Sequence, residues 1–154
     1  LKMIHIFLVV LFFGGILSSV ALNLHIDFTY YDEAYLGYKN IVTISDQIVR
    51  WGAIGTLLVG FTYGFFTNWG FFKHRWVGLK FILYIIQTVV GIFIVDELMM
   101  ENMELLETQK ELALSNPDFI QNHIVRQYAV YFQIVVTIFI FIISFLRPWK
   151  KKKI

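Results

Sequence analysis

Four long apolar runs constrain this chain of 154 residues more than any other feature of its sequence. They cover residues 4–24, 48–66, 76–95 and 128–146. Each is close to the roughly 20 residues that a helix needs to cross a hydrocarbon core about 30 Å thick. Inside lipid a spanning segment satisfies its own backbone hydrogen bonds, so runs of this kind form helices. The sequence therefore predicts an all-α integral membrane protein that folds as a four-helix bundle.

The composition supports this class and excludes several others. The chain is 58% hydrophobic and 16% charged, whereas soluble domains are about 45–50% apolar and about 25% charged. A chain of this length suits a single domain, here residues 1–154. It contains no cysteine, which excludes disulfides, thiolate metal sites and cysteine nucleophiles. The sequence carries no hydrolase or nucleotide-binding motif, and we expect membrane lipids but no nucleic acid among its partners.

Basic and acidic residues separate to opposite sides of the predicted membrane. With four crossings, both termini and the loop before the third run share one side, which carries none of the 11 acidic residues. Nine of the 13 basic residues lie there: Lys2, Lys73, Arg75, Lys80, Arg147, Lys150, Lys151, Lys152 and Lys153. Cationic flanks are retained in the cytoplasm. Together with a composition rich in Ile, Phe and Lys, this predicts a multi-pass protein of a bacterial plasma membrane with both termini cytoplasmic.

Helical patterns extend beyond the membrane on the extracytoplasmic side. The expected helices cover residues 4–24, 41–66, 76–98 and 117–146, and the third continues to about residue 114 because leucines recur at helical spacing after residue 98. Asn116 is the expected N-cap of the last helix, with Pro117 as its first residue. We interpret the first run as a retained helix, since it is longer than the apolar region of a signal peptide. The basic tail after residue 146 fits a topology anchor or, alternatively, an anionic-lipid contact.

Two basic side chains fall inside the predicted membrane near its inner face, where ionisable groups are costly. His5 is a candidate ligand for haem iron or another metal, or a proton carrier near neutral pH. Lys80 lies at similar depth and is able to neutralise a propionate, a carboxylate or a lipid head group. The structural alternatives are a hydrogen bond across helices for His5 and an ammonium that extends to the surface for Lys80.

Three further candidates for cofactor binding lie on the same helical faces. Tyr84 and Gln87 continue the stripe of Lys80, and Arg50 lies near the outer end of the second run. Arg50 also fits an ion pair with Asp46 one helical turn earlier. Each run thus has one small or polar face, and we expect the four faces to meet in a semi-polar interior. The faces are His5, Leu8, Phe12, Gly15 and Ser19; Asp46, Arg50, Ala53, Leu57, Gly60 and Gly64; Lys80, Tyr84, Gln87 and Gly91; and Gln133, Thr137 and Ser144.

Short motifs along the chain resemble a known group of membrane families. Leu-Lys-Met-Ile-His-Ile-Phe at 1–7 and Phe-Gly-Gly at 13–15 resemble the opening of the four-helix families around CopD, the HemJ-type protoporphyrinogen oxidases and DUF2269. Trp-Val-Gly-Leu-Lys at 76–80 is similar to the start of their third helix, and Phe-Leu-Arg-Pro-Trp at 145–149 to the end of the DUF2269 type. Gln87 and Gly91 occupy the region where a HemJ-type enzyme carries a second histidine. The resemblance therefore implies a DUF2269-like protein.

These observations lead to three hypotheses about function. The first is a protein that binds a haem-like molecule such as haem b, a quinone-like molecule or a metal in the bundle for redox or haem-related chemistry. His5 is then the ligand or proton relay, and Lys80 the anion partner. The second is a non-catalytic subunit or scaffold of a larger membrane complex or homo-oligomer, packed through its glycine faces, such as Gly60-x-x-x-Gly64 with Gly52 and Gly55, and through its acidic outer cap. The third is copper handling by Met99, Met100 and Met103. The sequence leaves open whether the chain is an enzyme.

The absence of cysteine makes the topology directly testable. We expect a Glu104→Cys variant to react with a membrane-impermeant maleimide added to intact cells, because this residue lies on the predicted outer side. A Lys152→Cys variant should react only after the cells are permeabilised. The unsubstituted chain is the control, since it has no thiol. Labelling of Lys152→Cys in intact cells would reverse the assigned orientation.

Overall fold

The computed structural model describes residues 2–66 and 75–146, and almost all of them are helical. The elements are α1 (Lys2–Leu24), α2 (Tyr31–Ile44), the π-helical segment η1 (Ser45–Val49), α3 (Arg50–Phe66), α4 (Arg75–Val90), the π-helical segment η2 (Gly91–Asp96), α5 (Glu97–Gln109), the 3₁₀ segment η3 (Lys110–Ser115) and α6 (Pro117–Leu146). Because η1 and η2 continue their neighbours without a break, the described residues form four long helices. Each is long and apolar enough to cross a membrane, which confirms the predicted all-α class.

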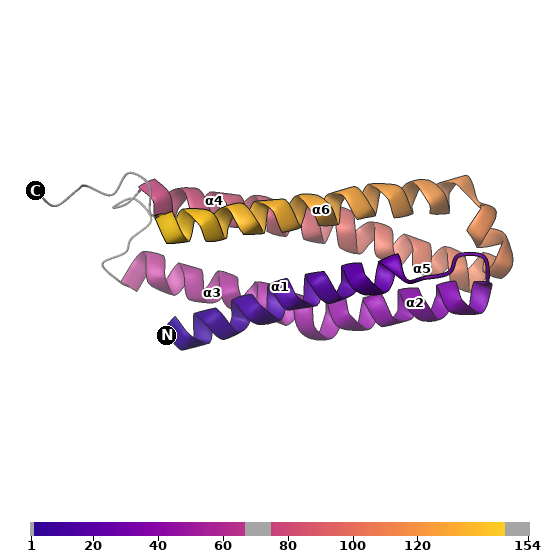
Figure 1. The fold of residues 1–154 in the computed structure, drawn as a ribbon, viewed down its shortest axis with the longest axis horizontal. Coiled ribbons are helices and arrows are strands. Elements are labelled where there is room, and N and C mark those ends of the chain that lie inside the picture. The colour runs from indigo at the N-terminus through magenta and orange to yellow at the C-terminus, as the bar shows by residue number, and fades with distance from the viewer. Residues whose placement is uncertain (1, 67–74, 147–154) are drawn as a thin grey trace, which may run out of the picture.

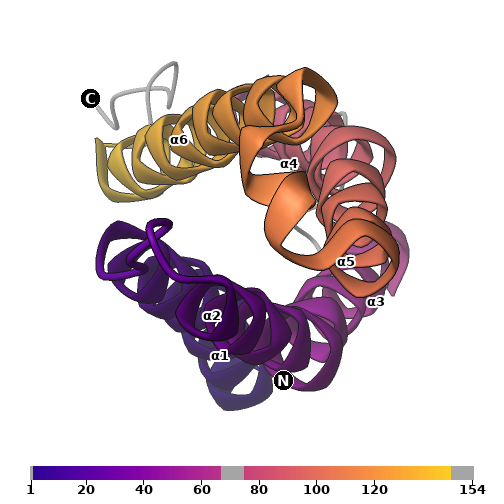
Figure 2. The same cartoon turned by 90° about the vertical axis from the view of Figure 1, so that its right-hand side faces the viewer.

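The four long helices form two hairpins that lie side by side (Figure 1). In the first, α1 packs against α2, η1 and α3, and in the second, α4, η2 and α5 pack against α6. The start of α1 and the end of α6 lie at the same end of the bundle (Figure 1). The other end, here called the acidic end, is formed by residues 24–46 and 96–120 and carries every Asp and Glu of the chain. Seen from the acidic end, α2 and α5 lie next to one another where the two hairpins meet (Figure 2).

The second long helix begins at Tyr31, well before the expected start near residue 41. The reason is a stripe of buried residues at helical spacing, Ala34, Tyr38 and Ile41. Tyr38 packs in a cluster with Leu106 of α5 and Phe119 of α6. The acidic end therefore has its own small hydrophobic core, and this core makes residues 31–44 helical outside the apolar run.

The third and fourth helices agree closely with the sequence pattern. The third runs from Arg75 to Ser115, and the fourth covers Pro117–Leu146 as expected. The predicted cap is confirmed, because the Asp118 N–H donates to Asn116 Oδ1 at 2.9 Å and Pro117 is the first helical residue. This cap closes the tight connection between η3 and α6.

Glycines let the two helices of the first hairpin approach closely. A Cβ built on Gly52 would lie 2.6 Å from the backbone nitrogen of Phe12, and one built on Gly55 would lie 2.6 Å from the Leu8 side chain. By contrast, Gly60 meets only the Phe81 ring at ordinary van der Waals distance. The close α1–α3 contact thus depends on Gly52 and Gly55, the pair that the sequence presented as a second small surface.

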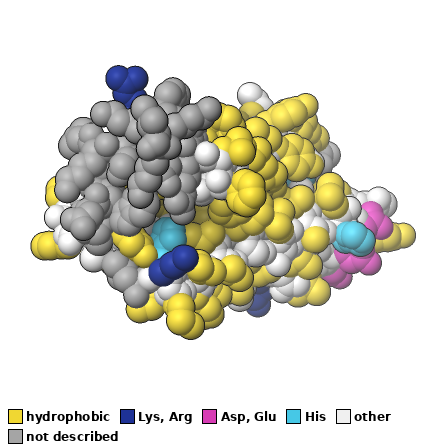
Figure 3. Space-filling view, turned by 60° about the vertical axis from the view of Figure 1, so that its left-hand side comes forward, with side chains coloured by type: hydrophobic (Ala, Val, Ile, Leu, Met, Phe, Trp, Pro, Cys, Tyr) yellow, Lys and Arg dark blue, Asp and Glu magenta, His cyan; other side chains and the backbone are white. Residues whose placement is uncertain are grey.

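The outer surface of the bundle is largely hydrophobic. Figure 3 shows apolar side chains over the middle of the molecule, with acidic side chains gathered at the acidic end. Large apolar residues such as Phe7, Leu58 and Phe93 are more than half exposed. A surface of this kind is stable against lipid tails and agrees with a multi-pass membrane protein.

The glycine contacts give a matched pair of substitutions. We expect Gly52→Ala to lower the free energy of unfolding by about 1–3 kcal/mol, because the new methyl group meets the rigid backbone of α1. Gly14→Ala should leave it unchanged or raise it by up to about 1 kcal/mol, because a methyl group added there meets no atom within 4 Å and alanine favours helix. Reversible unfolding in mixed micelles measures both. Equal effects of the two substitutions would refute the close α1–α3 packing.

Candidate functional site

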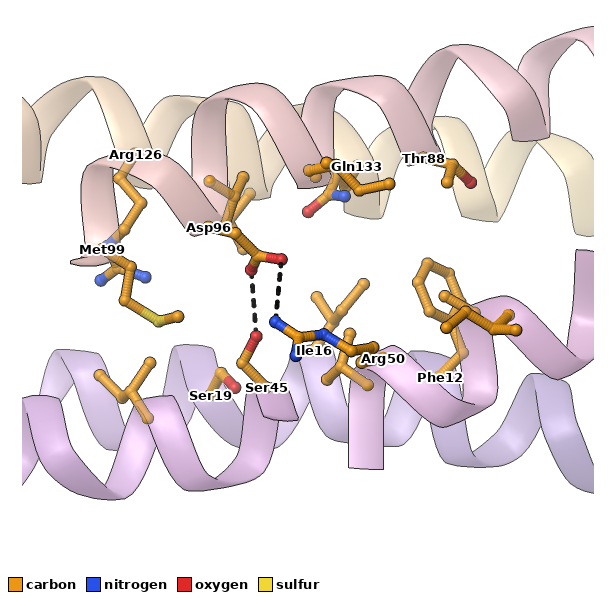
Figure 4. A pocket seen from close by; sticks show the side chains of 18 of the residues that line it. Phe12, Ile16, Ser19, Ser45, Arg50, Thr88, Asp96, Met99, Arg126 and Gln133 are labelled. Atoms are coloured by element: carbon orange, nitrogen blue, oxygen red, sulfur yellow. Dashed lines mark hydrogen bonds and ion pairs between the residues drawn. The ribbon is translucent and has the colours of Figure 1, made fainter. Parts of the chain in front are cut away.

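A cavity of about 400 Å³ lies between the two hairpins. Its walls come from α1, α2, η1 and α3 on one side and from α4, η2, α5 and α6 on the other (Figure 4). Most of the lining is apolar, with Phe12, Ile16, Leu57 and Val130 among the wall residues. Polar groups gather toward the acidic end. The cavity is therefore apolar over most of its lining and polar toward the acidic end.

Both π-helical segments face this cavity. Ser45 and Val49 of η1 line one wall, and Gly91, Val95 and Asp96 are among the η2 residues that line the opposite wall. A π turn contains one residue more per turn than an α-helix, which widens the helix locally, and such turns occur frequently at functional sites. Among the described residues, one π segment occurs in each hairpin, and the Ser45–Asp96 hydrogen bond puts the two at the same level. Both π-helical segments of the described residues therefore lie at the cavity.

A polar bridge joins the two π segments across the cavity. Ser45 Oγ donates to Asp96 Oδ1 at 3.1 Å, and Arg50 Nη2 lies 4.0 Å from Asp96 Oδ2 (Figure 4). The same Arg50 nitrogen lies 3.0 Å from Asp46 Oδ1, so the predicted ion pair between these residues is confirmed. Arg50 thus lies near an acid of each hairpin, 3.0 Å from Asp46 and 4.0 Å from Asp96.

Arg126 of α6 reaches the cavity beside Met99 (Figure 4) and is almost completely buried, with 3% of its surface exposed. Its Nη2 donates to Asn23 Oδ1 at 2.8 Å, and its guanidinium lies 5.5 Å from the ring centre of Tyr38. Its Nε is buried without a hydrogen-bond partner among the described residues. No carboxylate of the described chain forms an ion pair with it. Arg126 is therefore a buried cation with an unused donor.

A second polar network holds the acidic end together around Tyr38. The Tyr38 hydroxyl forms a 2.6 Å hydrogen bond with His123 Nδ1 and accepts a 3.1 Å hydrogen bond from Asn102 Nδ2. The same Asn102 nitrogen donates to the Phe119 carbonyl at 3.2 Å. Tyr38 and Asn102 are fully buried. Three helices, α2, α5 and α6, are thereby joined next to the Arg126 guanidinium.

The structure places His5 and Lys80 away from the cavity, toward the end where α1 starts. The His5 ring packs edge-on against Tyr63 at 5.8 Å, and its Nδ1 is buried without a hydrogen-bond partner in the described chain. Lys80 Nζ lies 4.7 Å from the centre of the Trp76 ring. Neither residue belongs to the cavity lining. A ligand in the cavity therefore does not reach them.

Tyr84 and Gln87 serve the packing of helices. The Tyr84 hydroxyl donates to the Ala53 carbonyl at 2.8 Å and so joins α4 to α3. Gln87 is fully buried, and its Oε1 accepts a 2.7 Å hydrogen bond from Thr137 while its carbonyl accepts one from Gln133 Nε2 at 3.0 Å. These bonds join α4 to α6. Of the five residues predicted to bind a cofactor, only Arg50 lines the cavity.

The predicted semi-polar interior is nevertheless confirmed. Residues from each of the four faces identified in the sequence line the cavity: Phe12 and Ser19; Arg50, Ala53 and Leu57; Gly91; and Gln133. Of the three methionines proposed for copper, Met99 and Met103 are buried and Met100 is 53% exposed. Met99 alone belongs to the lining.

Sequence reasoning missed Arg126 and Asp96 as cavity residues. A signal for Arg126 was present, since it precedes Gln133 and Thr137 by seven and eleven residues and so shares their helical face. Asp96 carried no such signal, because its position depends on the π turn that ends there. A π turn shifts the phase of the helix and breaks the regular spacing.

Comparisons with known proteins found no counterpart: no protein-family model matches this chain, and neither a curated protein nor a solved structure matches it. Function must therefore be argued from the residues of the chain itself.

The Tyr38 network gives a testable stability prediction. We expect Tyr38→Phe to lower the free energy of unfolding by about 1–3 kcal/mol, because Asn102 and His123 lose the hydroxyl partner in a buried place. Tyr128→Phe is the matched control, since Tyr128 is 70% exposed, and it should stay within about 0.5 kcal/mol. Unfolding in mixed micelles measures both. An unchanged stability for Tyr38→Phe would contradict the structural role of the network.

Proposed function

We propose that this chain binds a membrane-soluble organic molecule of quinone-like build, with an apolar body and a small polar head, in the cavity between its two hairpins. The observation that carries the proposal is the cavity of about 400 Å³ lined by both π segments. This volume falls within the range of about 300–1,000 Å³ typical of small-molecule sites. Such sites are mostly apolar with a few placed polar groups, which is the composition of this lining.

The arrangement of the lining supports an orientation for the ligand. The polar groups Ser45, Arg50 and Asp96 lie toward the acidic end, and Phe12 lies deeper in the bundle (Figure 4). A ligand with its polar head at Ser45, Arg50 and Asp96 and its apolar body against Phe12 matches both parts of the lining. Any redox chemistry then belongs to the ligand, and the protein supplies a dry chamber and hydrogen bonds to the head.

Haem b fits this cavity poorly. Iron in haem proteins takes axial ligands from His, Cys, Met or Tyr, and within the lining only Met99 is of these types. His5, the ligand expected from the sequence, stands outside the lining, as does its proposed anion partner Lys80. The lining therefore favours an organic molecule without a metal.

The proposal includes a location and an orientation in the membrane. The separation of basic and acidic residues supports a bacterial plasma membrane with the acidic end outside and both termini in the cytoplasm. The polar end of the cavity then lies in the outer half of the bilayer. A ligand is able to enter laterally from the membrane, where molecules with quinone-like build are dissolved.

Spectroscopy and extraction of the purified protein test this function. Protein purified in a mild detergent is scanned from 350 to 700 nm before and after dithionite, and its organic extract is analysed by mass spectrometry. We expect no Soret band and a near-stoichiometric organic molecule in the extract. An empty extract together with a reproducibly co-purifying protein would support the scaffold hypothesis instead. A Soret band that His5→Ala abolishes would support haem.

A substitution that fills the cavity should remove the ligand. Ala53 lines the cavity in α3, so Ala53→Phe places a phenyl ring in the space assigned to the apolar body. We expect the molar ratio of extracted ligand to protein to fall at least several-fold. Leu58→Phe is the control, because Leu58 lies on the same helix with 60% of its surface exposed and does not line the cavity. An equal ratio in both variants and in the unsubstituted protein would place the ligand elsewhere.

A further inference from the structure

We infer that the ligand of the cavity is an amphiphile with an acidic head, a carboxylate or a phosphate, which binds to Arg126. This inference rests on the proposed function and specifies its ligand: the head carries negative charge and lies at Arg126, which lines the same cavity as Ser45, Arg50 and Asp96. It rests on two observations. Arg126 is a buried cation without an ion pair among the described residues, and the cavity extends from Arg126 into the apolar part of the bundle.

Arg126 has an unmet need for an anion. Only 3% of its surface is exposed, yet within the part of the chain that the structure describes it forms no ion pair. Asn23 accepts from one guanidinium nitrogen, and the ring of Tyr38 faces the cation, but Nε is left without an acceptor. Burial of a charge is unfavourable unless that charge is paired and hydrogen-bonded. A bound anion satisfies both requirements at once.

The acids near the cavity are already engaged. Asp96 accepts from Ser45 at 3.1 Å and lies 4.0 Å from Arg50, and Asp46 lies 3.0 Å from the same Arg50 nitrogen. Asn23, which does contact Arg126, is neutral. The guanidinium fork of arginine matches the two oxygens of a carboxylate or phosphate. A neutral quinone carbonyl would fill one donor position but would leave the charge uncompensated.

The cavity extends from Arg126 in the direction that an apolar tail requires. Arg126 stands just before the apolar run 128–146, at the level where head groups meet the hydrocarbon core. From there the lining continues along α6 through Val130 to Gln133 and along α1 from Ser19 to Phe12. An acidic head at Arg126 thus leaves its tail in the apolar part of the cavity.

Binding of a fluorescent fatty acid to the detergent-solubilised full chain tests the inference. The probe is 11-(dansylamino)undecanoic acid, compared with its methyl ester, which has the same tail and no charge. We expect the acid to bind roughly tenfold more tightly or better, the scale of one hydrogen bond to a charged group. Arg126→Gln should bring the affinity for the acid to that for the ester and leave the ester unchanged. Arg126→Lys should retain part of the preference, because it keeps the charge and loses the fork.

Control variants separate the inference from the proposed function. Arg75→Gln removes a charge at the far end of α4, outside the cavity, and should leave the preference intact. Ala53→Phe should weaken the acid and the ester alike. Equal binding of acid and ester that Ala53→Phe still weakens would overturn the acidic head and leave the proposed function standing. Failure of both probes and of decylubiquinone to bind the unsubstituted protein would overturn both.

Competition identifies the source of the acidic head. Dodecyl phosphate and dodecanoate are titrated against the bound probe. Displacement by dodecyl phosphate at the lower concentration supports a phosphate-headed lipid, and displacement by dodecanoate at the lower concentration supports a free fatty acid. Dodecyl maltoside, which has a neutral head, should not compete at the same concentrations. If it displaces the probe equally well, the charge of the head has no role and the inference fails.

Discussion

The contacts of Ser45 and Arg50 with Asp96 link the two hairpins at the level where both π segments face the cavity. Within each hairpin, packing is close: Gly52 and Gly55 bring α3 onto α1, and Gln87, Gln133 and Thr137 tie α4 to α6. Between the hairpins, the walls separate and enclose the cavity. The bridge links the hairpins at the π segments, and the hydrogen bonds from Tyr84 to Ala53 and from Arg126 to Asn23 link them at other levels. The chamber thus results from two tight pairs held apart at a defined distance.

Burial of Arg126 is the second constraint, and it explains the polar core at the acidic end. Asn23 accepts a hydrogen bond from the guanidinium, and Asn102 donates one to the neighbouring Tyr38. Apolar residues such as Leu106 and Phe119 lie in the same region. Polar groups in such surroundings are unfavourable unless hydrogen-bonded. The network satisfies most of them. Two buried atoms of this region have no hydrogen-bond partner among the described residues: Asn102 Oδ1, and Nε of Arg126, which lines the cavity. Arg126 therefore belongs both to the polar core of the acidic end and to the proposed binding site.

The sequence predicted the scaffold well because lipid restricts the choices. Four apolar runs in a bilayer must be helices, and Asn116 followed by Pro117 marks a helix start by local chemistry. The inward faces could also be predicted, since helical spacing alone puts Phe12, Ala53 and Gln133 on them. The early start of α2 was missed because it depends on tertiary contacts of Tyr38.

The predicted site departs further from the structure, for physical reasons. His5 and Lys80 attracted attention because charge inside a membrane is unusual, but the cavity forms at the other level of the bundle. Its location depends on two π turns and on the separation of the hairpins, which no residue pattern in one helix encodes. Asp96 joins the site through such a turn. Arg126 was recognisable only by extending the Gln133 stripe beyond the apolar run.

The most direct test of the central claim is a high-resolution structure of the full chain in lipid nanodiscs made from membranes of the producing cells. The account predicts a continuous, elongated density between α1, α3 and α6, with its head beside Arg126 and the two π segments intact around it. Contradiction would come from a cavity closed by side chains of the opposing hairpins, or one with no density, together with an Arg126 paired to a carboxylate of the protein itself.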